Sequence, residues 1–322
     1  MKTILGVDIG YGHVKIVLMT DDGDVQSIFK YPSIIGITEK NEFLSDTRIY
    51  GFRDNNYYVG DDALNLPSEN VVDITEYKNL EYYAPLFLYK ALKMVDVVPD
   101  VIITGLSKAQ LENSGFFKEA LQHFTVNGEQ FTFDNLYVLP QGAGSKLAID
   151  KYGYDFPNIQ TEFTGGSTYV GVDIGFNTLD MFYVSKGKAS PNVFEGIEHE
   201  GVMKIASMLI KQIEADHGRK ISLHEAQNAL DSKVYKLRGQ KYDLSDQINL
   251  IKKDYMKSLL ILIENRYGKI LDKCDFIFLT GGGSTFFNTT GNQFIRVPKS
   301  HHEYYNSVGF ALWGIQKSKS IN

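Results

Sequence analysis

Apolar positions along the chain follow two spacings, one typical of strands and one typical of helices. Apolar runs at residues 3–8, 14–19 and 25–29 are separated by turns of glycine, aspartate and histidine, and they predict three strands. Residues 77–95 instead carry apolar side chains three and four positions apart, which predicts an amphipathic helix. The rest of the first half is predicted to contain strands at 101–104 and 135–139 and helices at 109–124 and 141–150.

The second half begins with the same three-strand pattern and continues mainly with helices. Three helices are predicted, at 202–215, 222–230 and 243–267. Ser222 and Glu225 have the spacing of a capping box at the start of the second of them. A buried strand at 276–280 runs into three glycines, and a short helix is expected around 307–317. Because strands and helices alternate in both halves, the sequence predicts an α/β fold.

A short repeat indicates that the two halves are related. The residues Gly-Val-Asp-Ile-Gly occur at positions 6–10 and again at 171–175. Each copy is followed by a turn, an apolar run and a second turn, so each is predicted to form a strand, a glycine turn and further strands. Two such halves, each with an acidic residue beside a glycine turn, suggest a cleft that grips a phosphate chain from both sides.

Composition limits the classes of protein that fit. The chain has 322 residues, enough for two domains, and its formal net charge of −6 argues against a general electrostatic grip on nucleic acid. The single cysteine, Cys274, excludes an internal disulfide framework and fits a reducing compartment. No signal peptide and no apolar run of the roughly 18 residues that span a membrane is visible. A cytoplasmic protein is therefore expected.

The first copy of the repeat has the residue types that a nucleotide phosphate chain needs. Gly10 and Gly12 allow a tight turn in which backbone N–H groups come close to an anion. Lys15 adds a mobile positive charge that can reach the outer phosphates. Asp8 would be repelled by phosphate, so its expected role is to hold Mg²⁺ through water.

The second copy and the triple glycine complete the candidate site. Asp173 offers a second carboxylate near the metal, and Thr178 can donate its hydroxyl to a phosphate. The glycines at 281–283 leave room for a flat base or ribose against the backbone. Each of these signals is weak alone, because glycine turns are common, but their combination is specific.

Five motifs in this order resemble those of the actin/Hsp70/sugar-kinase ATPase superfamily. The two phosphate motifs are Asp8-x-Gly10-x-Gly12-x-x-Lys15 and Asp173-x-Gly175-x-x-Thr178-x-Asp180, and the adenosine motif is Thr280-Gly281-Gly282-Gly283. The two interdomain connectors match residues 139–144 and 306–311. Within the superfamily the chain most resembles the short prokaryotic actins, the ParM-type plasmid-segregation group and its archaeal relatives.

This resemblance implies two actin-like (RNase H-like) domains of duplicated topology around a nucleotide cleft. Domain I would comprise residues 1–155 and 306–322, with a small insertion at 36–70. Domain II would comprise residues 156–305, with a helical insertion at 195–270. The polar stretch 151–166 and the region of Asn306 would form the hinges. Residues 39–67 are polar and irregular, and they could be an accessory subdomain or a mobile loop.

The resemblance also implies roles for individual residues. Gln141 would orient the attacking water, and Asp8 and Asp173 would hold Mg²⁺ and complete the catalytic set. Lys211 or Gln212, on the helix after the second hairpin, would reach the base or ribose. The nucleotide-binding residues would be Gly10, Tyr11, Gly12, His13, Lys15, Gly175, Asn177, Thr178, Lys211, Gln212, Gly281, Gly282, Gly283 and Ser284.

The function implied is that of a slow ATPase that forms dynamic filaments, for plasmid or other DNA segregation. Its cofactors would be Mg²⁺ and ATP, with GTP also possible, and its partners would be further copies of itself and a small DNA-binding adaptor. Direct contact with nucleic acid or membrane is not expected. Two alternatives stay open. One is a small-molecule kinase of the same superfamily, which would need a carboxylate where Gln141 stands, and the other is a non-hydrolysing, nucleotide-gated scaffold.

Other residues are given structural interpretations. Asp180 is expected to make a hydrogen bond within the second hairpin, and His13 to face solvent. The His301-His302-Glu303 run is not expected to bind a transition metal, because neighbouring side chains point apart. The basic stretch 233–241 is expected to be a solvated loop. Tyrosines at 57, 58, 82 and 83 could be filament contacts or ordinary half-buried packing.

Overall fold

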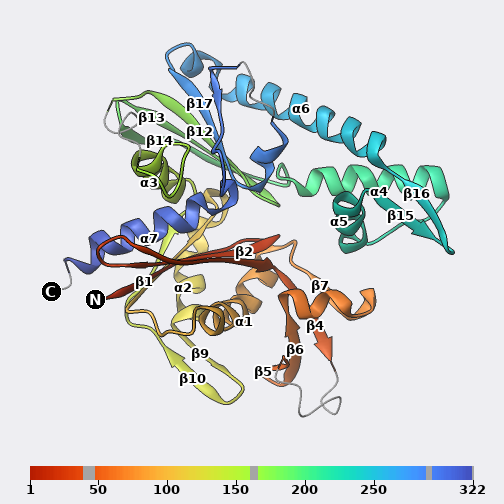
Figure 1. Cartoon of the computed structure of the whole chain (residues 1–322), viewed down its shortest axis with the longest axis horizontal. Helices are drawn as coiled ribbons and strands as arrows, with labels where there is room; N and C mark the ends of the chain where they lie inside the picture. Colours follow the sequence, from red (N-terminus) through yellow and green to blue (C-terminus); the bar gives the residue numbers. More distant parts are fainter. Residues whose placement is uncertain (39–47, 160–165, 288–291, 321–322) are drawn as a thin grey trace.

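Two five-stranded sheets with equivalent strand orders form the two halves of the molecule (Figure 1). They belong to a computed structural model that describes residues 1–38, 48–159, 166–287 and 292–320. Within this described part, no helix combines the length and apolarity needed to cross a bilayer.

The first sheet has the order β11-β8-β1-β2-β3. Its strands are β1 (Thr3–Ile9), β2 (His13–Thr20), β3 (Val25–Pro32), β8 (Val101–Leu106) and β11 (Leu136–Pro140). The first three form an antiparallel meander, and β8 and β11 add to β1 in parallel. Each of the five overlaps one of the predicted strands, because their apolar runs are bounded by clear turn residues.

The second sheet repeats this arrangement with the order β14-β13-β12-β17-β18. Its strands are β12 (Tyr169–Ile174), β13 (Thr178–Ser185), β14 (Lys188–Glu198), β17 (Phe276–Thr280) and β18 (Ile295–Arg296). Again three strands form an antiparallel meander and two add in parallel. The predicted α/β fold of duplicated topology is confirmed.

Helices cover both faces of each sheet. In the first half, α1 (Tyr77–Val95) packs on the face formed by Leu5, Val7 and Ile9, and α2 (Ser114–Gln122) lies beside α1. The opposite face, which includes Ile4, receives α7 (Tyr305–Ser318). The period of two along a strand therefore separates two cores on the two sides of one sheet.

The second sheet is covered in the same way. Its outer face packs against α4 (Met203–His217) and α6 (Ser245–Leu271), and its inner face packs against α3 (Ala143–Tyr152). Helix α5 (Leu223–Ser232) packs beside α4. It is followed by the hairpin of β15 (Val234–Leu237) and β16 (Gln240–Asp243). Ser222 and Glu225 form the predicted capping box at the start of α5.

The predicted irregular region 39–67 contributes to a small subdomain. A sheet of order β5-β6-β4-β7 consists of β4 (Ile34–Thr38), β5 (Tyr50–Phe52), β6 (Asn55–Val59) and β7 (Val71–Asp73). Two 3₁₀ helices, η1 (Gly60–Asn65) and η2 (Ser68–Asn70), connect β6 to β7. Residues 39–47 of the predicted region lie outside the described residues. Tyr57 and Tyr83 are buried with their rings edge to face, which favours the packing interpretation of these two tyrosines.

Two hairpins replace elements that the sequence predicted differently. The helix expected at 109–124 divides into η3 (Lys108–Asn113) and α2, and its end becomes β9 (His123–Val126), paired with β10 (Glu129–Thr132). Asn127 and Gly128 both have positive φ, as a tight hairpin turn requires. The stretch 233–241 is likewise a hairpin and not a loop, turning at Arg238 and Gly239.

The two halves are joined by α3 and α7, which cross between the sheets (Figure 1). At the crossing, a Cβ on Gly309 would lie 1.7 Å from the backbone oxygen of Gly144. The chain leaves the first sheet at Pro140 and enters α3, which packs on the second half. The expected domain boundary at residue 155 therefore lies after this helix. Of the expected linker 151–166, residues 160–165 lie outside the described part of the chain.

A buried carboxylate makes a second connection between the halves. Asp180 on β13 accepts hydrogen bonds from the Ser107 hydroxyl at 3.0 Å and from the Lys108 backbone N–H at 2.8 Å. The partners of Asp180 thus lie in the first half and not within the hairpin, as the sequence suggested. Burial and the nearby charge of Asp173 raise the pKa of Asp180 to about 7, against the effect of the two donors.

Replacing Gly309 by alanine should destabilise the protein by about 2 kcal/mol or more, because the added methyl group meets backbone and not a movable side chain. Urea unfolding followed by circular dichroism measures this change. Gly268→Ala in α6 is the matched control, since its Cβ would meet only the flexible Glu264 side chain at 2.9 Å. Equal stability of Gly309→Ala and the parent would contradict the close crossing.

Asp180→Asn should be more stable than the parent at pH 8 by about 2 kcal/mol, with a difference that shrinks toward pH 4. The folded-state pKa lies above the unfolded value, so the parent loses stability as pH rises toward 7, whereas the neutral amide does not. Unfolding of both proteins without nucleotide or Mg²⁺, over this pH range, tests the prediction. A constant difference across the range would show that Asp180 does not titrate as described.

Candidate functional site

A cavity of about 500 Å³ lies between the two halves. Twelve of the predicted site residues line it: Asp8, Gly10, Tyr11, Gly12, His13, Lys15, Gln141, Asp173, Gly175, Thr178, Gly281 and Gly282. They come from both glycine hairpins, from the end of β11 and from the end of β17. Segments distant in the sequence therefore meet at one site, as the duplicated motifs predicted.

The first hairpin connects β1 to β2 at the cavity wall. Its turn is closed by a hydrogen bond from the Gly10 N–H to the His13 carbonyl at 3.3 Å, and the Ser33 hydroxyl donates to the Gly10 carbonyl at 2.5 Å. A Cβ on Gly12 would lie 2.8 Å from the Phe176 side chain of the second hairpin. Gly12 is thus needed because the two hairpins approach each other closely.

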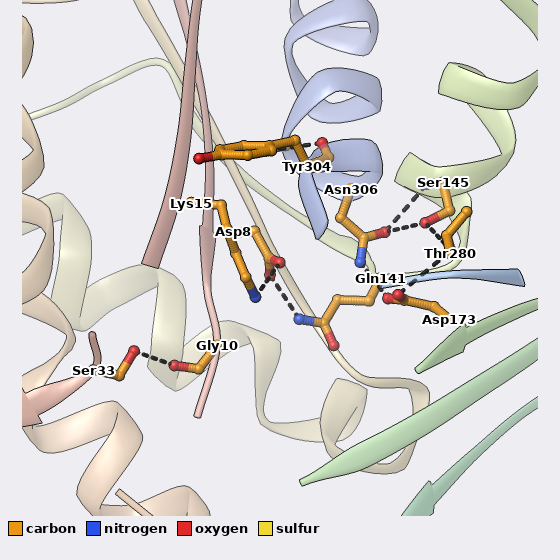
Figure 2. A network of polar contacts seen from close by, with 11 residues as sticks. Asp8, Gly10, Lys15, Ser33, Gln141, Ser145, Asp173, Thr280, Tyr304 and Asn306 are labelled. Carbon is orange, nitrogen blue, oxygen red and sulfur yellow. Dashed lines mark hydrogen bonds and ion pairs between the residues drawn. The ribbon is translucent and has the colours of Figure 1, made fainter. Parts of the chain in front are cut away.

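Asp8 is buried at the end of β1 and has two polar partners (Figure 2). Lys15 Nζ lies 3.2 Å from Asp8 Oδ2, and Gln141 Nε2 donates to Asp8 Oδ1 at 2.8 Å. Figure 2 shows the Gln141 amide oxygen pointing away from Asp8. Asp8 therefore fixes the orientation of the Gln141 amide, since a carboxylate can accept only from the NH₂ group.

Asp173 stands at the equivalent position on β12. Asn306 Nδ2 donates to Asp173 Oδ2 at 2.5 Å, and Thr280 Oγ1 donates to Asp173 Oδ1 at 3.4 Å. The Asn306 amide oxygen in turn accepts from the backbone N–H and the hydroxyl of Ser145. In the sequence, Thr280 was recognisable only as part of the adenosine motif and Asn306 only as part of a connector and hinge, while Ser145 carried no signal. Only tertiary contact shows that these residues support Asp173.

The electrostatics of the two carboxylates favour a bound cation. Burial and, to a lesser extent, the nearby negative charge of Asp8 raise the pKa of Asp173 to about 6. Lys15, Asn306 and Thr280 offset this only in part. Carboxylate oxygens are the ligands that Mg²⁺ prefers, and Mg²⁺ keeps several of its waters. The donor set therefore fits Mg²⁺ held by Asp8 and Asp173.

The triple glycine has two different roles. Gly281 has positive φ, and a Cβ there would lie 2.4 Å from Asp173 Oδ1, while Gly282 lines the cavity. Gly283 faces away, because its Cβ would meet the Ile174 side chain at 2.3 Å. The Ser284 hydroxyl is buried and donates to the Gly281 carbonyl at 2.8 Å. Gly283 and Ser284 shape the turn and do not line the cavity.

Three further predicted contacts do not line the cavity. Asn177 is buried and bonds to the Thr75 carbonyl at 3.3 Å and to the His199 ring at 3.1 Å. Lys211 and Gln212 are exposed on α4, and Gln212 bonds to Asp216. Both side chains lie on the solvent-facing side of α4, whereas Ile205 of the same helix lines the cavity, so a contact of Lys211 or Gln212 with the base or ribose stays a prediction.

Helix α5 supplies four polar side chains to the cavity. His224, Gln227, Asn228 and Asp231 recur at helical spacing along its cavity face. Asn228 Nδ2 contacts His224 Nε2 at 3.1 Å. A polar stripe on a surface helix ordinarily indicates solvent exposure, so the sequence carried no distinct signal for this wall.

Two family models match the chain in adjoining parts. The model for the N-terminal domain of actin-like proteins matches residues 6–144, and the model for the C-terminal domain of the archaeal actin homologue MreB-like group matches residues 171–290. Each matched region contains one of the two phosphate hairpins. The search of curated proteins returned no match.

Solved structures share the fold over the whole chain. An archaeal actin homologue, Ta0583, has a TM-score of 0.74 at 19% identity, with all of both chains covered. A subunit of a 15-stranded ParM filament from Clostridium botulinum has a TM-score of 0.73 at 18% identity, covering 98% of this chain and 99% of that one. Bacillus thuringiensis ParM with ATP has a TM-score of 0.64 at 16% identity, with 99% of each chain covered. With both halves matched by actin-like family models and the same fold found throughout, the chain belongs to the actin-like superfamily.

Proposed function

We propose that this protein binds a magnesium nucleoside triphosphate between its two hairpins and hydrolyses it slowly. The observation that carries the proposal is that Asp8 and Asp173 face one cavity from opposite halves, with Gln141 hydrogen-bonded to Asp8 beside them. Two family members whose structures are similar to this one, Ta0583 and Bacillus thuringiensis ParM, contain ADP and ATP respectively.

The phosphate chain would lie between the glycine turns. Backbone N–H groups of Tyr11 and Gly12, and of the turn after Gly175, would contact its oxygens, with Lys15 and the Thr178 hydroxyl adding side-chain contacts. The base and ribose would lie toward Gly282 and the polar face of α5. ATP is the favoured nucleotide and GTP is the alternative. Measuring the affinity of the protein for each would distinguish them.

Hydrolysis would depend on positioning. A neutral amide is a poor base, so Gln141 would act by accepting a hydrogen bond from the attacking water through the oxygen that Asp8 directs away from itself. Mg²⁺ bound through Asp8 and Asp173 would neutralise charge on the outer phosphates. Turnover would be slow, because the described group beside the attacking water is the neutral Gln141 amide and not a strong base. A slow hydrolysis step would limit how long the subunit stays in the nucleotide-bound state.

The wider role would be that of a dynamic filament that segregates plasmids or other DNA in the cytoplasm. Nucleotide would bridge the halves and favour a closed subunit that joins the next one head to tail, which generates an open polymer. The ParM filament from Clostridium botulinum supports this assembly by analogy. A small DNA-binding adaptor would connect the acidic filament to its cargo, without direct contact to nucleic acid or membrane.

Light scattering should rise when Mg-ATP is added above a critical protein concentration, because bound nucleotide favours the assembling state. GTP and ADP are measured in parallel, and negative-stain microscopy identifies the scattering species. A flat trace with every nucleotide, over a broad range of protein concentration, would remove the filament part of the proposal.

Gln141→Ala should slow phosphate release about tenfold or more while leaving assembly largely intact, because the water-positioning amide is lost while both phosphate hairpins stay in place. Gln130→Ala on the exposed β10 strand is the control for a loss of glutamine elsewhere. Turnover of Gln141→Ala equal to that of the parent would show that another group orients the water.

A further inference from the structure

A buried glutamine outside the cavity links the two phosphate hairpins. Gln110, on η3 of the first half, is 3% exposed. Its side-chain Nε2 donates both to the Tyr11 hydroxyl and to Glu198 Oε1, the second at 2.6 Å. Tyr11 belongs to the turn of the first hairpin, and Glu198 is the strand partner of Thr178 in the second. One amide group therefore contacts both structures that face the phosphate site.

The chemistry of the three groups determines how they pair. An ionised carboxylate only accepts hydrogen bonds, so the NH₂ group of Gln110 must face Glu198. The Gln110 oxygen is then buried without a partner among the described residues. Leaving a buried acceptor unpaired costs free energy. The Gln110 oxygen thus lacks a hydrogen bond, while both N–H groups of the Gln110 amide point at Tyr11 and Glu198.

The segment that carries Gln110 is held firmly against the second half. Ser107 and the Lys108 backbone donate to Asp180 just before it. A Cβ on Gly196 of β14 would lie 2.5 Å from the Ala109 nitrogen, so the two backbones are in close contact. Gln110 is thus placed by a rigid contact, and the Tyr11 side chain, 7% exposed, docks onto it.

We propose that Gln110 is a positioning residue that sets the spacing of the two phosphate hairpins by holding Tyr11 and Glu198 together. The proposal rests on the proposed nucleotide function only for its effect on binding. Its structural part, the spacing of the two halves, holds with or without nucleotide. Gln110 does not line the cavity, so it acts on the ligand only through the hairpins.

A swap of the two side chains gives a direct test. Gln110→Glu places two carboxylates against each other and removes both donors. Glu198→Gln alone keeps a polar partner and should be milder. The double variant Gln110→Glu/Glu198→Gln restores a donor and an acceptor in the opposite order, with the Tyr11 hydroxyl donating to the new carboxylate. The control is Gln130→Glu/Glu214→Gln, the same exchange at exposed positions of β10 and α4 outside the link.

Two measurements are made on full-length protein. The dissociation constant of a fluorescent ATP analogue should rise roughly tenfold to a hundredfold in Gln110→Glu and return to within about threefold of the parent in the double variant. Spin labels at Asp54→Cys and Arg238→Cys, in a Cys274→Ser background, report the distance between exposed sites of the two halves without nucleotide. This distance should shift or broaden in Gln110→Glu and be restored in the double variant.

The outcomes separate the proposal from its premise. Unchanged label distances in Gln110→Glu would overturn it, and so would a double variant that is no better than Gln110→Glu, because packing alone would then explain the effect. If the parent binds no nucleotide, the proposed function fails, while the label distances still decide whether Gln110 sets the spacing. Restored distances with restored binding support both.

Discussion

The close crossing of α3 and α7 is the contact on which the site depends. At Gly144 and Gly309 the two helices approach until backbone meets backbone, because neither residue has a side chain to hold them apart. This approach places Asn306, in the first turn of α7, against both Ser145 of α3 and Asp173 of the second sheet. A shift of either helix would therefore move a buried carboxylate in the cavity. Helix packing at the crossing therefore determines the position of the Asp173 charge in the cavity.

Duplicated topology explains why the site carries so much unbalanced charge. Two equivalent sheets face each other through α3 and α7, so the equivalent strand ends present Asp8 and Asp173 to the same space. One lysine and a few amides compensate only in part, as the raised pKa of Asp173 shows. Two buried carboxylates facing each other destabilise the protein when no cation is bound. A bound cation with its anionic ligand would remove this destabilisation. This cost is a physical reason to expect that the nucleotide stabilises the closed arrangement.

Connections between the halves are distributed around the cavity and not confined to the helix crossing. Asp180 with Ser107, Gln110 with Tyr11 and Glu198, and Asn177 with Thr75 all lie beside the hairpins. At the part of the cavity beside α5, the second half contributes the polar face of α5. The first half contributes Asp61 and Leu64 of the small subdomain. The hairpins are thus supported from behind by buried and partly buried polar contacts.

Local patterns in the sequence determined the elements and the chemical groups of this protein, and tertiary structure decided how they combine. Helix α1 and strand β17 have the predicted limits, and the capping box at Ser222 forms as expected, because periodicity and capping are properties of neighbouring residues. The glycines and aspartates of the hairpins were identifiable for the same reason. The polar wall that α5 adds to the cavity, and the partners of Asp180 in the other half, depend on segments that are far apart in sequence but adjacent in space. No local spacing encodes such distances, so only the packed structure could show them.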